Sequence, residues 1–488
     1  MRWIALLFPS LPLDVFARAL RPGDARAPLV VHGDGRAPRV VAANAAAREA
    51  GIRDGMPLAA ALALCPGVAQ VARDVAAEDA ALAQLATFAL TFTPAASLAE
   101  DAIVADIGPS LRLFGGEEKL VASLVGGVRE RGFAVRSGLA PTPLAAVALA
   151  RSGDGRRIDD GDVAAALAPL PLAHFGLDAD ALATLAAAGV RTFGAADRLP
   201  RGGLARRCGR AFVAALDRAA GRASDPRVPF LPPPQFAAKL ELPANVHDVA
   251  ALAFAVNRLV QELASWLLAR GLGVTELALA LSHERALARS LDSPCTHARF
   301  ALAAPSRTSA HLMHVLRERL ARVALPAPVA GIALATEAVA PLAGRNHALL
   351  PGGEADAPEV PLVDRLRARL GDDAVRLVVP HADHRPERAM RASSPGGGAT
   401  GTPLPAAIEA PRPVWLLREP RPLAGLIEAQ PWVLREGPER IESGWWDGGD
   451  VRRDYFVAES PSGEVAWIFR DHRRGTDDGE WFLHGLFG

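Results

Sequence analysis

Lysine, cysteine and tyrosine are scarce in this chain of 488 residues. Lys119 and Lys239 are the only lysines, so nearly all positive charge is arginine, which in an alanine-rich chain indicates coding bias rather than function. Cys65, Cys208 and Cys295 are scattered, which excludes a disulfide framework and a cysteine metal site. This usage is typical of a reducing compartment, and we expect a cytoplasmic protein.

Long apolar runs are also missing. None approaches the roughly 20 residues of a membrane span, and residues 1–20 lack the basic start and cleavage site of a signal peptide. We therefore expect no membrane partner. Apolar residues still make up 50% of the chain, enough for the cores of the three or four domains that its length predicts.

Basic and acidic residues balance over the whole chain, with 54 of each, but not along it. Residues 111–345 contain 28 basic and 20 acidic residues, whereas residues 346–488 contain 17 and 23. The basic middle is compatible with binding to nucleic-acid phosphates, although a solvated face would have the same composition.

Residues 1–165 alternate short apolar runs with helical patterns, which is typical of an α/β domain. The first strand, WIALLF, leads into a turn with two prolines and then into a short helical pattern. Further strands are expected at 28–33, 39–44, 102–108 and 133–141, and helices at 76–92 and 117–132.

Residues 166–227 are predicted to be helical, with loops rich in glycine, proline and arginine. LPLAHFGLDADALATLAAAGV resembles a helix-hairpin-helix unit, whose glycine turn exposes backbone N–H groups to a DNA phosphate. Gly176 is present in the turn, but Asp178 stands where a second glycine is usual. Candidates for phosphate contact, or else for a plain solvated helix end, are Arg201, Arg206, Arg207 and Arg210.

The second half of the chain predicts two further domains. A stiff proline-rich tether at 228–235 precedes a βαββαβ order of elements at 236–340, which indicates one compact domain. Residues 341–413 combine a loop, a short helix and a linker that is flexible by composition. Residues 414–488 hold six of the eight tryptophans in short alternating runs and predict a small β-rich domain.

Several motifs resemble the Y family of translesion DNA polymerases, the UmuC/DinB-like proteins. VVAANAAAREAGIRDGMPLAAALALCPG is similar to the family's fingers stretch, and SGLAPTPLAAVALA to its palm stretch. GPERIESGWWDGGDVRRDYFVAE and WFLHGLFG are similar to the C-terminal signature of the ImuB-type subfamily. The resemblance implies an α/β and α+β multidomain fold: palm and fingers at 1–165, thumb at 166–227, little finger at 236–340, and a β-rich domain at 414–488.

Catalysis in this family depends on three acids that hold two Mg²⁺ ions. The first acid falls on Pro9, and the second acidic position of the same strand falls on Leu11. The later Asp-Glu pair falls on Asp101 and Ala102, and a further family Asp falls on Asp106. Because at most one of the three metal ligands remains, the resemblance implies a protein that is not an enzyme and needs no Mg²⁺ cofactor.

The triphosphate pocket of the family is altered as well. Its Tyr falls on Ala45 and its palm Lys on Pro143, whereas Arg48 is retained. Asp14 is a conceivable displaced metal ligand, but it lies five residues past the expected site, in the expected helix. Glu100 is shifted by one residue from the pair, which on a strand turns its side chain to the opposite face.

The binding parts of the family remain. In the little finger, Arg285, Arg289 and Arg299 are candidate contacts to the DNA backbone, with ordinary surface arginines as the alternative. Bacterial translesion proteins carry a sliding-clamp peptide of the form Gln-x-x-Leu-Phe after this domain. The corresponding candidates, or else an ordinary loop, are Asn346, Leu349 and Leu350.

The C-terminal aromatic residues allow two interpretations, a hydrophobic core or a partner-binding surface. For Trp445 and Trp446 we expect the core. The ImuB-type resemblance implies that this region contacts ImuA, a RecA-like protein, and an error-prone DnaE-type polymerase.

Three hypotheses follow for the function. The first is a non-catalytic adaptor in damage-induced mutagenesis that binds primer-template DNA, the sliding clamp and a separate polymerase. The second is an active translesion polymerase with unconventional metal ligands. The third is a DNA-binding repair factor without clamp or polymerase partners.

Overall fold

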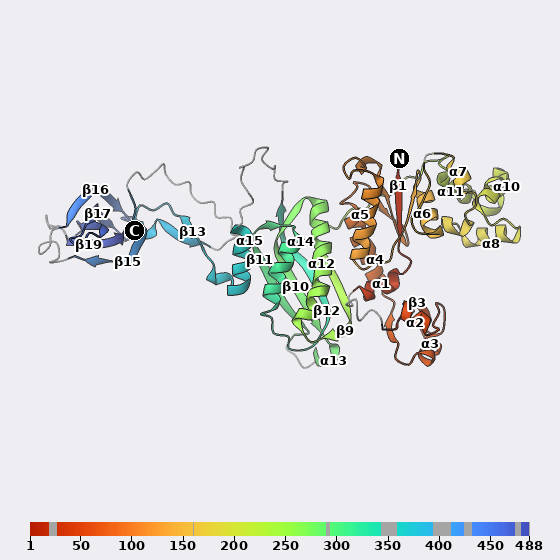
Figure 1. Ribbon diagram of the computed structural model, residues 1–488, viewed down its shortest axis with the longest axis horizontal. Helices are drawn as coiled ribbons and strands as arrows, with labels where there is room; N and C mark the ends of the chain where they lie inside the picture. Colours follow the sequence, from red (N-terminus) through yellow and green to blue (C-terminus); the bar gives the residue numbers. More distant parts are fainter. Residues whose placement is uncertain are drawn as a thin grey trace. The chain divides into compact units, whose positions relative to one another are not determined.

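The computed structural model describes residues 1–18, 27–159, 161–288, 293–342, 359–393, 411–423, 432–473 and 480–487. The chain divides into two compact units, Met1–Arg369 and Leu370–Gly488 (Figure 1). Among the helices in these ranges, none combines the length and the apolar character needed to cross a bilayer.

The first sheet of unit 1, which we call the palm sheet, has the order β5-β6-β1-β7-β8. Its central strand β1 (Trp3–Leu7) has apolar side chains on both faces, and helices cover each face. Ile4 and Leu6 pack with α4 (Val75–Ala89) and α5 (Glu117–Glu130), while Ala5 and Leu7 pack with α6 (Pro143–Ser152). The remaining strands are β5 (Ala96–Leu98), β6 (Ala102–Asp106), β7 (Arg136–Ala140) and β8 (Arg156–Arg157).

A small second sheet, with the order β3-β2-β4, lies between α1 (Leu11–Ala17) and α4 in the chain. Asn44 joins its parts, because the side-chain oxygen accepts from the N–H groups of Leu29 and Ala47. Its elements are β2 (Leu29–His32), β3 (Val40–Ala43), α2 (Ala45–Glu49), α3 (Leu58–Leu64) and β4 (Ala69–Ala72).

A run of short helices follows α6 and shares its core with the palm sheet. Phe175 and Phe193 stack at its centre, with ring centroids 5.0 Å apart. Side chains cap several of these helices, as when Asp178 accepts from the N–H of Ala181. The helices are α7 (Val163–Leu167), η3 (Leu172–Phe175), α8 (Ala179–Ala187), α9 (Phe193–Asp197), α10 (Arg201–Cys208) and α11 (Arg210–Ala219).

A second α/β region of unit 1 has an antiparallel sheet of order β11-β10-β12-β9, which we call the little-finger sheet. Its elements are β9 (Ala237–Val246), α12 (Val249–Arg270), β10 (Leu272–His283), α13 (Arg285–Ala288), β11 (Cys295–Ser306), α14 (Ser309–Leu320) and β12 (Val329–Pro341). Apart from the short α13, this is the predicted βαββαβ order. The helices α12 and α14 pack on one face of the sheet.

The proline-rich segment 228–235 is hydrogen-bonded to both parts of unit 1 that it connects, the palm sheet and helix α12. The N–H of Phe230 donates to the carbonyl of Ala96 on edge strand β5 over 2.7 Å. The indole of Trp266 on α12 donates to the carbonyl of Pro233 over 2.9 Å. Arg18 and Glu262 add a buried ion pair between α12 and the residue that follows α1.

Unit 2 contains a five-stranded antiparallel sheet of order β15-β19-β18-β17-β16 and a two-stranded hairpin. The aromatic core of the sheet includes Tyr455, whose hydroxyl contacts Nδ1 of the buried His484 at 2.8 Å. Burial lowers the pKa of His484 to about 4, so this imidazole is neutral at pH 7. The strands are β13 (Leu377–Pro380), β14 (Met390–Ser393), β15 (Trp415–Pro422), β16 (Val433–Ser443), β17 (Val451–Glu459), β18 (Val465–Asp471) and β19 (Glu480–Leu486).

The predicted fold class is confirmed: a mixed α/β and α+β chain of several sheets with a β-rich C-terminal part.

Candidate functional site

The register of the palm sheet brings three of the predicted acidic positions, Pro9, Asp101 and Ala102, to one end of the sheet. Leu7 of β1 lies opposite Ala102 of β6. One residue further, the N–H of Phe8 donates to the carbonyl of Asp101 over 3.0 Å. Pro9 therefore lies directly beyond the strand end, beside the hairpin that carries Asp101 and Ala102. We call this edge the palm end.

Ala102 is closed inside a hydrophobic core. Its side chain is 0% exposed and packs with Leu7 and with the buried face of α6. A carboxylate at this position would lie in the same apolar surroundings, where an unpaired charge is strongly disfavoured. Pro9 also has no side-chain oxygen, so neither Pro9 nor Ala102 can ligate a metal ion through its side chain.

Asp101, the third position, is already engaged by a cation. The guanidinium of Arg151, near the end of α6, donates to Oδ1 of Asp101 over 2.8 Å. The same guanidinium donates to the carbonyl of His174 in η3 over 3.3 Å. Burial, reinforced by the nearby Arg151, lowers the pKa of His174, and the cation that pairs with the Asp101 carboxylate is Arg151.

Leu11 and Asp14 belong to helix α1 and not to the palm end. Leu11 is buried in the core. Oδ2 of Asp14 accepts from the N–H of Ala134 over 2.8 Å, and burial raises the pKa of this carboxyl to about 7. Asp14 is thus an anchor for the backbone that precedes β7.

Asp106 lies at the opposite end of the sheet. It faces Trp3 across β1 and β6, about 13 Å along the strand from position 102 at the usual rise per residue. Its Oδ1 accepts from the N–H of Gly108 over 3.0 Å. Asp106 and Asp101 therefore cannot hold one metal pair between them.

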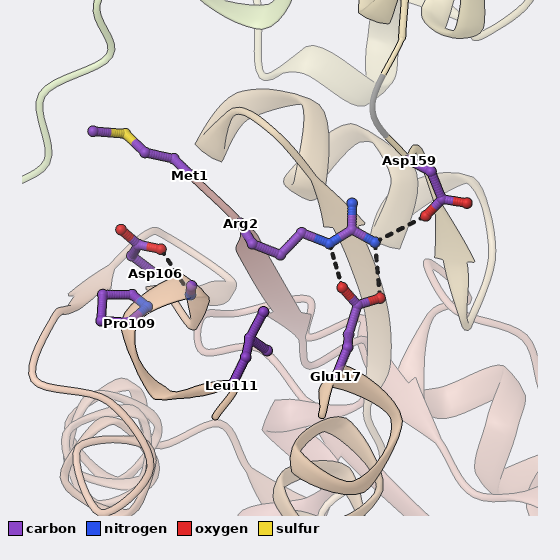
Figure 2. A pocket seen from close by; sticks show the side chains of 8 residues that line it. Met1, Arg2, Asp106, Pro109, Leu111, Glu117 and Asp159 are labelled. Atoms are coloured by element: carbon purple, nitrogen blue, oxygen red, sulfur yellow. Dashed lines mark hydrogen bonds and ion pairs between the residues drawn. The ribbon is translucent and has the colours of Figure 1, made fainter. Parts of the chain in front are cut away.

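A cavity of about 610 Å³ lies beside Asp106 rather than at the palm end (Figure 2). Arg2 extends across it toward Glu117 and Asp159, with Nε–Oε2 and Nη2–Oδ1 distances of 2.5 and 3.2 Å. Glu117 and Asp159 therefore form a structural ion-pair network with Arg2.

The residues at the palm end do not fit a two-Mg²⁺ centre, because one is a proline, one is a buried alanine and the aspartate is paired. Across the described residues, no three Asp, Glu, His or Cys side chains gather closely enough to hold a metal ion.

The three residues that the resemblance matches to the family's triphosphate pocket lie on two helices, α2 and α6. Arg48 is exposed at the end of α2 and pairs with Asp54 at 3.4 Å. Ala45 begins the same helix, and Pro143 occupies the first position of α6 behind the cap residue Thr142. Of these three residues only Arg48 is charged, and it lies on α2 beside the small second sheet.

The four thumb arginines differ in their surroundings. Arg201 is bound to Asp197 and Asp217, each at 2.9 Å, so its charge serves the thumb itself. The other three are exposed around the turn at Gly209, where α11 begins without a side-chain cap. They are Arg206, Arg207 and Arg210.

The turn at Gly176 and Asp178 also differs from a helix-hairpin-helix phosphate site. Gly176 has the expected left-handed backbone, with φ of 61°. The carboxylate of Asp178, however, caps the N-terminus of α8 and satisfies the N–H of Ala181. A DNA phosphate would have to displace this anion.

The little-finger sheet has a second face, away from α12 and α14, with small side chains. Cross-strand pairs place Ala278 beside Ala335 and Ala280 beside Ala333. On edge strand β11, the exposed Arg299 lies opposite Ala278. Lys239 on β9, which we did not single out from the sequence, lies opposite Ala333 and pairs with Glu241.

Several predicted residues cannot be placed. Arg289 and the clamp candidates Asn346, Leu349 and Leu350 lie outside the described residues. Arg285 belongs to α13, but its side chain is not described.

The core interpretation of two tryptophans was wrong. Trp445 is 76% exposed and Trp446 is 59% exposed, because the turn between β16 and β17 carries them beyond the sheet. The core of this unit is formed instead by Tyr455, Trp467 and Phe469.

Two arginines with organising contacts were missed from the sequence. Arg151 binds Asp101 from 50 positions away, and Arg385 binds Asp447 from 62 positions away. No local pattern marks either residue, because each partner is brought near only by the fold.

The palm sheet, the small second sheet, the helical region and the little-finger sheet, in this order, define a protein of the Y-family polymerase type. Residues 14–151 match the family described as impB/mucB/samB. The chain is 32% identical over 475 residues to Protein ImuB from two strains of Caulobacter vibrioides, which covers 90% of this chain and 100% of each relative. The chain belongs to the ImuB family.

Solved structures with a similar chain include a Y-family DNA polymerase chimera and DinB from Sulfolobus solfataricus. Both are 18% identical to this chain, with TM-scores of 0.41 and 0.40. Each match covers 69% of this chain and 98% of the other.

Proposed function

We propose that this protein is a non-catalytic Y-family homologue that acts as a DNA-binding adaptor in damage-induced mutagenesis and translesion synthesis. It binds primer-template DNA and docks on the sliding clamp, the β subunit, through Asn346, Leu349 and Leu350. It thereby links the clamp to an error-prone DnaE-type polymerase and to ImuA. Its membership of the ImuB family supports this role.

The observation that carries the proposal is that none of the three positions at the palm end, Pro9, Asp101 and Ala102, has a free carboxylate to bind a metal ion. Two-metal catalysis needs several carboxylates around one pair of cations. Here Ala102 is enclosed in the core and Asp101 is bound to Arg151, while Pro9 lacks a ligand atom. The proposal therefore assigns the palm a structural role, as the support for the thumb and the small second sheet.

Two surfaces support a sequence-independent grip on DNA. Arg206, Arg207 and Arg210 surround an uncapped helix start, where arginines and backbone N–H groups can meet phosphates together. The small side chains of the little-finger sheet would let a DNA backbone approach closely, with Arg299 exposed at its edge.

A primer-extension assay with Mg²⁺ or Mn²⁺ tests the absence of catalysis. We expect no incorporation by a preparation that shifts the same primer-template in a gel, with an active Y-family polymerase as the positive control. Robust incorporation that disappears in Asp101→Ala would instead establish the active polymerase with unconventional ligands.

A binding assay with the purified sliding clamp tests the docking. We expect the wild type to bind and Leu349→Ala/Leu350→Ala to bind at least tenfold more weakly. If neither protein binds, the repair factor without clamp contact is the better description.

A further inference from the structure

Two adjacent tryptophans on the surface of unit 2 are unusual in being both exposed and fixed. Trp445 and Trp446 form an edge-to-face pair with ring centroids 5.3 Å apart. Large aromatic side chains are normally withdrawn from water, so two of them left exposed side by side contribute little burial to the stability of the isolated chain. Such residues are the commonest anchors of protein interfaces.

A buried arginine holds the turn that carries the pair. Arg385 is 2% exposed, and its two terminal nitrogens donate to the two carboxylate oxygens of Asp447 over 2.9 and 2.7 Å. It also donates to the carbonyl of Gly449 over 3.2 Å and lies over the ring of Trp446. Hydrogen bonds from Arg385 hold the pKa of Asp447 far below its usual range, so this contact persists at any physiological pH.

Two glycines make the fit of Arg385 into the turn possible. A Cβ on Gly444 would lie 2.3 Å from the carbonyl oxygen of Gly449, and the backbone there has φ of 87°. A Cβ on Gly449 would lie 2.7 Å from Nη1 of Arg385. The turn therefore has one closely packed arrangement, and little conformational entropy remains to be lost when the tryptophans are bound.

The net charge of unit 2 indicates which class of partner the tryptophans can bind. Residues 370–488 contain 14 arginines and no lysine against 19 acidic residues, a net charge of −5. Close to the tryptophans in the chain, the acidic residues Glu442 and Asp450 are flanked by Arg440 and Arg452, so the negative charge belongs to the unit as a whole. This net charge disfavours a nucleic-acid backbone or an anionic lipid surface and favours a protein with basic residues around an apolar cleft.

We infer that Trp445 and Trp446 anchor a protein partner in a cleft that is apolar inside and rimmed by lysine or arginine. The assignment rests on the proposed recruitment of a polymerase and ImuA, and it places one of these contacts on the turn held by Arg385. Asp447 and Arg385 are positioning residues, since they act by fixing the tryptophans.

Affinity measurements with the full-length protein test the assignment. The DnaE-type polymerase and ImuA of the same cell are the probes, each titrated against wild type, Trp445→Ala/Trp446→Ala and Trp415→Ala. Trp415 is the matched control, because it is 67% exposed in the same unit but lies on β15. We expect the double variant to lose at least tenfold in affinity for one probe, Trp415→Ala to lose less than threefold, and the affinity to fall with added salt.

The outcomes separate this assignment from the proposed function. If the wild type binds neither probe, the recruitment itself is wrong and the assignment falls with it. If the wild type binds and the double variant binds equally well, or Trp415→Ala loses as much, only the assignment is overturned. Loss of DNA binding in the double variant, with binding to both probes intact, would identify a nucleic-acid surface and overturn it as well.

Discussion

At the scale of single residues, the buried position 102 determines whether the palm end can accommodate an acidic side chain. We predict that Ala102→Glu lowers the free energy of unfolding by about 3 kcal/mol or more, because a longer, ionisable side chain must enter a filled apolar core. Urea denaturation measures this, with Ala63→Glu on the exposed face of α3 as the control. Unchanged stability would show that the core opens easily at this point.

Restoring acids should not restore synthesis. Pro9→Asp alone leaves Ala102 in the core and Asp101 bound to Arg151, so we predict no primer extension with Mg²⁺. Measurable incorporation by Pro9→Asp would mean that the palm end has been misjudged.

The raised pKa of Asp14 predicts that the free energy of unfolding depends on pH. Its carboxyl has a pKa of about 7 in the folded chain, against the ordinary value of 3.8 for an aspartate in water, so the folded state holds this proton more tightly than the unfolded state. The folded state therefore loses stability as the pH rises from about 4 to about 7, by an amount on the order of a few kcal/mol. Below and above that window the contribution is constant.

Asp14→Asn should remove this contribution while the amide oxygen still accepts from Ala134. We expect the variant to gain stability relative to wild type between pH 5 and pH 8, measured as unfolding free energies at both pH values. The exposed Asp34→Asn serves as the control. An equal difference at both pH values would contradict the assignment.

At the scale of elements, strands and helices with a clear apolar period could be predicted from the sequence. The elements against which they pack could not. The apolar run WIALLF predicts a strand, and β1 is that strand; its burial on both faces is seen only in the structure. The short helix expected within residues 341–413 is present as α15 (Glu359–Leu370), but its docking depends on contacts far away in the chain. No local pattern reveals such contacts.

A buried carboxylate helps to fix helix α15 to the little-finger sheet, together with the packing of Ala368 in the same core. Asp364 accepts from the N–H of Ala303 on edge strand β11 over 2.7 Å and from Nε2 of His311 on α14 over 2.9 Å. We predict that Asp364→Ala costs about 1–3 kcal/mol, because it leaves these donors unpaired. Hydrogen exchange should show faster exchange along α15, whereas Asp373→Ala, a fully exposed site, should leave the helix unchanged.

At the scale of the whole molecule, DNA binding should depend on exposed and not on paired arginines. We predict that Arg206→Ala/Arg207→Ala weakens primer-template binding at least tenfold and lowers the salt slope by about two, since each phosphate contact contributes about 0.9. Fluorescence anisotropy across a salt series measures both quantities. Arg452→Ala, which removes an exposed charge from the acidic unit 2, is the control, and an equal effect there would argue against a thumb contact.

The candidate sites were less predictable than the fold. Residue types alone suggested four thumb arginines, but the ion pairs of Arg201 with Asp197 and Asp217 arise only when α9, α10 and α11 meet. Aromatic residues in a β-rich region suggested a core for Trp445 and Trp446. The turn that exposes them depends on Arg385, which approaches from a separate hairpin region.

The closed core around Ala102 also bears on how this lineage can change. A carboxylate could be accommodated at position 102 only if Leu7 and the buried face of α6 were repacked to admit it. The core around Ala102 thus makes substitution at this position far costlier than substitution on the surface, so variants of this protein can diversify their surfaces more readily than this part of the palm sheet.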